Sequence, residues 1–353
     1  MKTEQLLGRM MAFKPVTEEI ERVNALVDFL AGYLRAGGLR VRIEKYGKRK
    51  ILYAGTRPGR TPAVLMNAHL DVIPAPDSLF KLRRSGQWLM GRGTNDCLGN
   101  CAVIANALIS VGAAADAGAV FSTDEETGGM TTARMVELGY CGRHIILVMD
   151  GSGYAVVTAQ KGILAVCMRA SGKACHSSTP WQGENAFDRL VDAYLRVRNA
   201  FPAVRAGDEW HTTMSANVIR AGTVFNRVPD TAEMLLDIRY TEAERPADLM
   251  KKLRKLSGSG LTIEIVKESP LMLCDEQAPA LQEFHTYMQR RLRRKIAWKR
   301  LNGATDARHF SACKIPIAII GVPGSGVHAL TERVSGDGLR RYEDMLRGYL
   351  MEG

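Results

Sequence analysis

The stretch from Asn67 to Gly99 carries residue types that suit metal chemistry. His69 and Asp71 follow an apolar run, and Asp96 stands in a glycine-rich segment further on. The apolar run is typical of a strand that is buried on both faces. In open α/β sheets, functional side chains gather beyond the carboxyl ends of the strands. Because a neutral imidazole and carboxylates are ligands for transition metals, this stretch predicts one part of a metal site.

Further candidate ligands follow later apolar runs. Glu125 and Glu126 come directly after one run, Asp150 ends another, and His328 follows a glycine-rich loop. Adjacent carboxylates are costly to bury unless a cation or a shared proton offsets their repulsion. Two histidines and several carboxylates at successive strand ends suit two Zn²⁺-like ions, about 3.5–4 Å apart, that share a water molecule. A nearby glutamate would take the proton of that water and give it to a leaving amine.

Each of these residues also has a plainer interpretation. Asp96 precedes a predicted helix and would serve as its N-cap. Asp71 is either a solvated turn residue or the partner of the second ring nitrogen of His69. A single histidine beside a strand is more often structural. The pattern as a whole, rather than any one residue, therefore indicates a metal hydrolase.

The elements that must position these residues predict two domains. Up to Asp150, apolar runs alternate with helical patterns, such as a helix over 17–36 that starts at Thr17, which favours a mostly parallel sheet flanked by helices. From there the order becomes β-α-β-β-α-β, which is typical of a ferredoxin-like α+β domain. A helix, a strand and a final helix follow. We expect an α/β catalytic domain formed by 1–159 and 269–353, and an inserted domain at 160–268.

The composition limits the classes of function. At 46% hydrophobic and 24% charged residues, the chain resembles ordinary globular proteins. No apolar run reaches the ~20 residues that span a bilayer, and the first residues lack the apolar core of a signal peptide. We therefore expect a cytoplasmic protein with no membrane partner. Seven cysteines without a CxxC pair favour reduced thiols over a disulfide framework.

The net charge of +11 raises the question of nucleic acid. The densest basic run, 290–295, follows a helical pattern that fits a solvated helix face, and no recognised nucleic-acid motif accompanies it. We therefore expect no nucleic-acid partner. A basic surface would also favour anionic substrates such as free carboxylates.

Motifs along nearly the whole chain resemble those of the M20 family of metallopeptidases and deacylases. They are Asn67-Ala68-His69-Leu70-Asp71, Gly91-Arg92-Gly93 with Asp96 and Gly99, Thr123-Asp124-Glu125-Glu126, Asp150-Gly151, Gly172-Lys173-Ala174-Cys175-His176, Asn226-Arg227-Val228-Pro229, Asp237-Ile238-Arg239, Thr305-Asp306-Ala307-Arg308, and His328 with Glu332. The resemblance implies a di-zinc exopeptidase-like fold. One departure is Asp96-Cys97-Leu98-Gly99, where the family commonly has Asp-x-Lys-Gly. The candidate ligand itself is retained.

The resemblance also implies roles for single residues. It assigns His69 and Asp150 to one metal ion, Glu126 and His328 to the other, and Asp96 as the bridge. Glu125 matches the general base, and Asp71 the residue that orients His69. The inserted domain would form a homodimer, and its His176 would polarise the scissile carbonyl in the partner's site. Asn226, Arg239 and Arg308 match substrate-binding positions, although an ion pair between Arg308 and Asp306 is an alternative.

These observations predict a hydrolase that cleaves an amide bond with two divalent ions, Zn²⁺ first and Co²⁺ or Mn²⁺ as alternatives. A small peptide is the favoured substrate, and an N-acyl amino acid is the second. Two other classes stay open: a binder of anionic polymers that uses the basic runs, and a metal-binding scaffold without activity.

Overall fold

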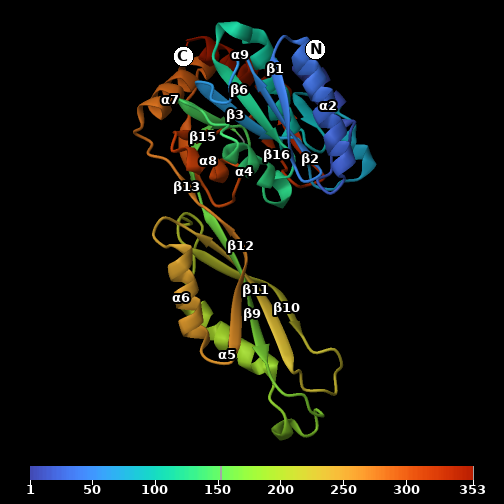
Figure 1. Ribbon diagram of the computed structural model, residues 1–353, viewed down its shortest axis with the longest axis vertical. Helices are drawn as coiled ribbons and strands as arrows, with labels where there is room; N and C mark the ends of the chain where they lie inside the picture. Colours follow the sequence, from blue (N-terminus) through green and yellow to red (C-terminus); the bar gives the residue numbers. More distant parts are fainter. Residues whose placement is uncertain (152, 353) are drawn as a thin grey trace. The chain divides into compact units, whose positions relative to one another are not determined.

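The computed structural model describes residues 1–151 and 153–352, and these divide into two compact units (Figure 1). The larger unit consists of Met1–Thr158, Cys274–Lys299 and Thr305–Gly353. The smaller consists of Ala159–Leu273 and Arg300–Ala304. Each unit has a hydrophobic core of its own. The larger unit carries all the candidate metal ligands.

A sheet with a parallel centre organises the larger unit. Within the described residues the strand order is β1-β2-β6-β3-β7-β15-β8-β13, with β14 beside β8. The strands β6, β3, β7 and β15 are parallel to one another, and the flanking strands are antiparallel. Their bounds are β1 Arg40–Tyr46, β2 Arg49–Gly55, β3 Val64–His69, β6 Ala117–Ser122, β7 Ile145–Val148, β8 Ala155–Gln160, β13 Met272–Leu273, β14 Ala297–Leu301 and β15 Ile317–Ile319.

The sequence pattern explains the buried centre of this sheet. Every residue of β3, β6 and β7 is buried, as expected of parallel strands that are covered on both faces. Alternate strand residues such as Met66, Ala68 and Phe121 join one large apolar cluster with side chains from five helices. These helices are α1 Thr3–Met11, α2 Ile20–Ala36, α3 Leu98–Val111, α7 Pro279–Leu292 and α9 Gly336–Glu352. The larger unit also contains α4 Met130–Glu137 and α8 Ala307–Phe310.

A second, small sheet in the larger unit was not expected from the sequence. Its order is β16-β17-β5-β4, all antiparallel. The bounds are β4 Arg83–Ser85, β5 Trp88–Met90, β16 Gly324–Ser325 and β17 Arg333–Ser335. Because β5 pairs with β17, the segment that follows β5 lies beside the segment that precedes β17. The first of these segments contains Asp96 and the second contains His328.

The smaller unit is an antiparallel sheet in the order β10-β11-β9-β12, with α5 and α6 packed on one face (Figure 1). The inner side chains of β11 alternate with outward ones and meet Leu190 and Ala193 of α5. The predicted ferredoxin-like order is present. The bounds are β9 Gly162–Ser171, α5 Ala186–Asn199, β10 Thr213–Ala221, β11 Thr231–Tyr240, α6 Pro246–Ser257 and β12 Leu261–Ser269.

Two sequence expectations were wrong in detail. The first long helix begins at Ile20 and has Glu19 at its N-cap position, because the Thr17 hydroxyl bonds to the carboxylate of Asp71 instead. Cys141 and Cys313 form a disulfide, whereas Cys97, Cys101, Cys167 and Cys175 are free, as expected. The two paired residues lie far apart in the sequence but have Cα atoms 6.1 Å apart. Among the described residues, no helix is both long and apolar enough to cross a membrane.

Candidate metal centre

His69, the last residue of β3, is held in one orientation by its surroundings. Its side chain is buried, and its Nδ1 lies 2.9 Å from the backbone carbonyl oxygen of Asp71. A hydrogen bond donated by Nδ1 leaves the lone pair of Nε2 free for a ligand. Nε2 lies 2.9 Å from Oδ1 of Asp96 and 3.6 Å from Oδ1 of Asp150. The ring therefore presents its second nitrogen to two carboxylates.

Asp71 supports both His69 and the carboxylates that follow β6. Its side chain is fully buried and accepts a hydrogen bond of 2.9 Å from the Thr17 hydroxyl. Its oxygens also accept the backbone N–H groups of Glu125 and Glu126, at 3.2 and 3.3 Å. Burial alone would raise the pKa of Asp71, but the interactions with His69 and these donors outweigh it and lower that pKa. Asp71 is therefore a charged anchor between two strand ends.

Asp96 lies between the two imidazoles. Its Oδ1 contacts Nε2 of His69, and its Oδ2 lies 3.2 Å from Nε2 of His328. The same nitrogen of His328 lies 3.0 Å from Oε2 of Glu126. His328 has a φ of 64°, which is uncommon outside glycine and typical of residues held in place for function. The five predicted ligands thus form one continuous chain of contacts.

The charge of this cluster fits bound cations. Burial raises the pKa of Asp150 to about 6 and that of Glu126 to about 7. Asp96 behaves differently: burial would raise its pKa, but hydrogen bonds from His328 and His69 lower it. Several partly buried carboxylates are therefore disfavoured as anions by their surroundings, and divalent cations would relieve that penalty. The ligand atoms of His69, Asp96 and Glu126 lie within 4.8 Å of one another, close enough to share an ion.

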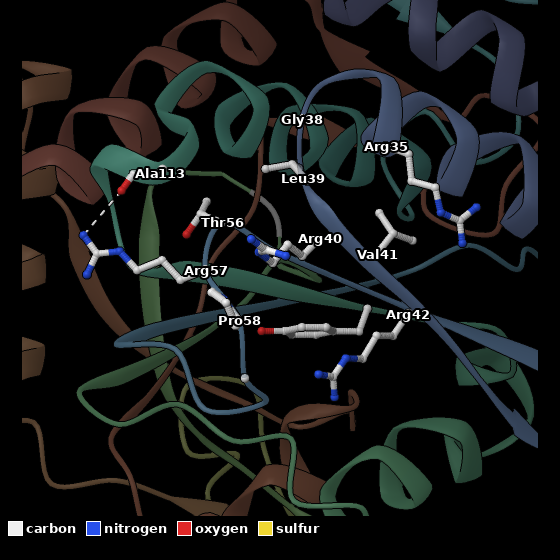
Figure 2. Close-up of a pocket in the computed structure, with 12 residues that line it drawn as sticks. Arg35, Gly38, Leu39, Arg40, Val41, Arg42, Thr56, Arg57, Pro58 and Ala113 are labelled. Carbon is white, nitrogen blue, oxygen red and sulfur yellow. Dashed lines mark hydrogen bonds between the residues drawn. The ribbon is translucent and has the colours of Figure 1, made fainter.

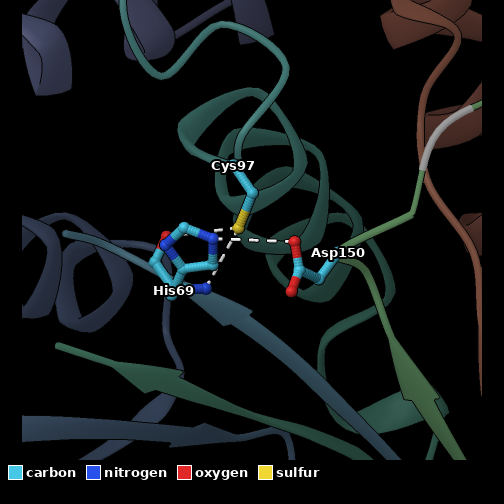
Figure 3. Close-up of side chains that lie close together, drawn as sticks. All are labelled: His69, Cys97 and Asp150. Atoms are coloured by element: carbon cyan, nitrogen blue, oxygen red, sulfur yellow. Dashed lines mark hydrogen bonds and ion pairs between the residues drawn. The ribbon is translucent and has the colours of Figure 1, made fainter. Parts of the chain in front are cut away.

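Cys97 adds a sulfur beside these ligands. Figure 3 shows the ring of His69 and the carboxylate of Asp150 pointing toward each other, with the Cys97 side chain next to them. The Cys97 sulfur accepts the backbone N–H of His69 at 3.1 Å, and it lies 3.3 Å from the His69 carbonyl oxygen. The thiol of Cys101 contacts the same carbonyl oxygen at 3.0 Å. The two thiols thus fix the backbone of His69 at the end of its strand.

Glu125 lies in a 3₁₀ turn, Glu125–Thr127, directly after β6. Burial raises the pKa of its carboxyl well above the ordinary value, the negative charge of Asp150 adds to this, and Arg308 opposes it. The Arg308 guanidinium lies 3.8 Å from the Glu125 carboxylate. It also donates to the carbonyl oxygens of Thr305 and Gly128, each at 2.8 Å. The surroundings of Glu125 thus favour the protonated form of its carboxyl group.

The partner of Arg308 differs from the one considered in the sequence. Its ion pair is with Glu125 and not with Asp306, whose carboxylate accepts the hydroxyls of Ser122 and Thr132 at 2.6 Å each. The Arg308 side chain is only 3% exposed. Its role toward substrate stays a prediction.

Sequence reasoning gave no role to the buried pair of Arg92 and Glu332. The two side chains form an ion pair, and the other carboxylate oxygen of Glu332 accepts the N–H groups of Asn95 and Asp96, at 2.9 and 3.1 Å. Arg92 also donates to the carbonyl oxygen of His328 at 3.3 Å. The pair thus ties together the two loops that carry Asp96 and His328. A signal was present, because an arginine and a glutamate both stood inside the motifs.

Known proteins similar to this chain point to one family. Residues 158–261 match the M20 peptidase dimerisation domain. A probable succinyl-diaminopimelate desuccinylase from Staphylococcus aureus is 22% identical, over 93% of this chain and 91% of its own length. A probable carboxypeptidase from Aspergillus clavatus is 25% identical, over 61% of this chain. The chain is thus similar to members of the M20 family along most of its length. The predicted resemblance to this family of metallohydrolases is thereby confirmed.

Solved structures confirm the predicted fold class of this chain. Aminopeptidase PepT from Bacillus cereus superposes with a TM-score of 0.81 at 16% identity, covering 100% of this chain and 99% of its own. An M20 family metallo-carboxypeptidase from Sulfolobus solfataricus gives the same TM-score at 14% identity, with 99% of each chain covered. The match to the Aspergillus carboxypeptidase spans only 57% of that protein's length.

Three predicted site residues of this chain lie in the smaller unit. His176 is exposed, with its Nδ1 2.7 Å from the hydroxyl of Ser178. Asn226 is also exposed, and its carbonyl oxygen accepts the backbone N–H of Ser177 at 3.0 Å. Arg239, on β11, pairs with Asp237 through two hydrogen bonds of 3.0 Å. His176 and Asn226 therefore lie on adjoining loops, where Arg227 and His176 form a β-bridge.

Proposed function

We propose that this chain is a two-metal hydrolase that cleaves the amide bond of a small peptide. The observation that carries the proposal is the chain of contacts that runs from Asp150 through His69, Asp96 and His328 to Glu126, with Glu125 beside it. A cluster of imidazoles and carboxylates with raised pKa values is the setting in which divalent cations bind.

His69 and Asp150 would hold one ion, Glu126 and His328 the other, and Asp96 both. Zinc is the first choice because it takes nitrogen and oxygen ligands, with cobalt and manganese as alternatives. When bound, such ions polarise a carbonyl group and lower the pKa of a water molecule between them.

Glu125 would act as the general base and then as the general acid. It accepts the proton of the attacking water at a carboxylate oxygen and returns it to the nitrogen of the leaving amine. A raised pKa suits this exchange because the group must bind and release a proton near neutral pH. Arg308 would keep the carboxylate in position through the ion pair of 3.8 Å.

The smaller unit would form the contact between the two subunits of a dimer and would contribute residues to the substrate site. The match to a peptidase dimerisation domain supports a homodimer. We infer that His176 donates a hydrogen bond to the carbonyl oxygen as negative charge develops there, in the site of the other subunit. Asn226 and Arg239 would hold the substrate, Arg239 through its planar guanidinium fork.

Deacylation of an N-acyl amino acid is the second candidate. The Staphylococcus desuccinylase, whose name describes such a reaction, matches nearly the full length of this chain. The peptidase reading draws on the carboxypeptidases and on the fold shared with aminopeptidase PepT. The two reactions differ only in the groups on either side of the amide.

A substrate panel decides between them. The purified chain, loaded in turn with Zn²⁺, Co²⁺ and Mn²⁺, is given dipeptides, tripeptides, acetyl amino acids and succinyl amino acids, and the released amine is measured. Turnover of peptides supports the first candidate, and turnover of acyl amino acids alone supports the second. If the metal-loaded chain turns over no compound of the panel, the remaining interpretation is a metal-binding scaffold without activity. An anionic-polymer binder would instead give a salt-sensitive shift of DNA or RNA.

A further inference from the structure

A cavity lined by arginines lies away from the candidate metal centre. It has a volume of about 600 Å³ and lies between the end of α2, the strand β1 and the loop after β2. This size falls within the range of small-molecule sites, roughly 300–1,000 Å³. Figure 2 shows the guanidinium groups of Arg35, Arg40, Arg42 and Arg57 distributed around it.

The cavity and the metal centre are at opposite ends of the same strands. Tyr53, which lines the cavity, stands over Gly118 near the start of β6, whereas Glu125 follows the end of β6. In the same direction β3 begins at Val64, opposite Ala117, and ends at His69, opposite Ser122. The arginines therefore have no part in the proposed amide cleavage.

The four arginines have no acidic partner: among the described residues, no salt bridge involves Arg35, Arg40, Arg42 or Arg57. The two acids of the neighbourhood pair with other arginines, Asp116 with Arg143 and Glu44 with Arg60. Of the four, Arg57 donates a long hydrogen bond of 3.4 Å to the carbonyl oxygen of Ala113. Exposed guanidinium groups gathered without counter-ions attract anions into the concavity.

The floor of the cavity is formed by a tightly packed tyrosine, Tyr53. Tyr53 is 2% exposed, and its ring lies over two glycines that face each other across β2 and β6. A Cβ atom at Gly118 would lie 2.7 Å from the Tyr53 hydroxyl oxygen, and one at Gly55 would lie 2.8 Å from it. Burial raises the pKa of Tyr53 to about 12, so the hydroxyl keeps its proton and can donate it in a hydrogen bond.

We propose that this cavity binds a small organic anion that carries two or more phosphate groups. A single carboxylate would leave three of the four cations unbalanced, whereas a chain of phosphates supplies several charges in a small volume. The guanidinium fork matches phosphate oxygens in pairs. Leu39, Val41 and Pro58 give the cavity apolar walls for the organic part.

Calorimetric titration tests this proposal. The chain of residues 1–353, as purified, is titrated with tripolyphosphate and with ATP in a buffer without magnesium. The wild-type chain should bind both, and the affinity should fall as salt rises. The variant R40Q/R57Q should bind at least roughly tenfold more weakly, with an unchanged melting temperature, because charge-assisted bonds are lost from exposed side chains. The control R254Q/R291Q removes the same charge from exposed arginines outside the cavity and should bind like the wild type.

Tighter binding of ATP than of tripolyphosphate would assign a role to the apolar walls, and equal binding would assign recognition to the phosphates alone. The proposal fails if neither compound binds at millimolar concentration. It also fails if R40Q/R57Q binds as well as the wild type, which would place the anion at bound metal ions. Equal weakening by both double variants would reduce the effect to net charge. Binding of a 20-nucleotide DNA strand with no binding of ATP would identify a polymer surface instead.

Discussion

Glu125 is the residue on which turnover should depend most. In Glu125→Gln the side chain keeps its size but cannot accept the proton of water, so kcat should fall by about 10²–10⁴-fold. The content of metal ions, measured by mass spectrometry, should be unchanged, because Glu125 is not among the proposed ligands. The control is Glu137→Gln, which alters an exposed glutamate on α4. Full activity of the Glu125 variant would remove the general base from the proposal.

Substitution of Arg308 tests whether this residue positions Glu125 or binds the substrate. Lysine keeps the charge but cannot reach the carbonyl oxygens of Thr305 and Gly128 together, so Arg308→Lys should lose about 1–3 kcal/mol of unfolding free energy. Glu125 would also lose its fixed partner, and kcat should fall. Chemical denaturation and steady-state kinetics check this, with exposed Arg341→Lys as the control. A higher KM at unchanged stability and kcat would instead assign Arg308 to the substrate.

At the scale of elements, the small sheet acts through the buried pair of Arg92 and Glu332. In Glu332→Gln the guanidinium of Arg92 stays buried without its counter-ion, which should cost about 3–5 kcal/mol of unfolding free energy. The same change at Glu352, whose pair with Arg290 is exposed, should cost less than about 1 kcal/mol. Urea denaturation of both variants measures the difference. Similar losses for the two would mean that the buried pair contributes nothing specific.

The long, strongly patterned elements could be predicted from the sequence. The buried strands and the order of the inserted domain follow from runs and alternation that any reader can count. The two-residue and three-residue strands β16, β17 and β5 could not, because so short a segment has no period. They form only through pairing between distant segments. That pairing brings Asp96 near His328, so the motifs named these residues while only the fold brought them together.

Local signals also misled where a tertiary partner was stronger. Thr17 has the residue type and spacing of an N-cap, yet its hydroxyl bonds to the buried carboxylate of Asp71. An unpaired buried carboxylate would cost more than a missing cap on an exposed helix end. In the same way, the cysteine count gave no hint that Cys141 and Cys313 would meet.

For the whole molecule, metal binding should increase the stability of the folded chain. Ions that bind the folded chain and not the unfolded one raise the free energy of unfolding by about 2.7 kcal/mol at a free concentration of 100 times Kd. Chelation should therefore lower the melting temperature, and added Zn²⁺ should restore it. The variant H69A/H328A should melt at one temperature with or without the chelator. A wild-type melting curve that ignores both treatments would argue against the metal centre.

Assembly can be tested by mixing two inactive variants. If His176 acts in the site of the partner subunit, Glu125→Gln and His176→Ala would each be weak alone. A mixed dimer would contain one site with both residues intact. After subunit exchange of equal amounts, roughly a quarter of the wild-type activity should return, as expected for random pairing in a symmetric dimer. Activity that stays at the mean of the two separate variants would mean that His176 does not act across subunits.

The place where the smaller unit joins the chain has a consequence for protein engineering. Ala159 and Leu273 are register partners in an antiparallel pair, and the backbone N–H of Cys274 donates to the carbonyl oxygen of Thr158 at 2.8 Å. The chain thus leaves and returns at nearly the same point. A domain whose two ends lie close together can be deleted, because a short turn can join the two chain ends that remain. The host unit could accept a foreign domain at this junction, provided that the paired ends of β8 and β13 are kept.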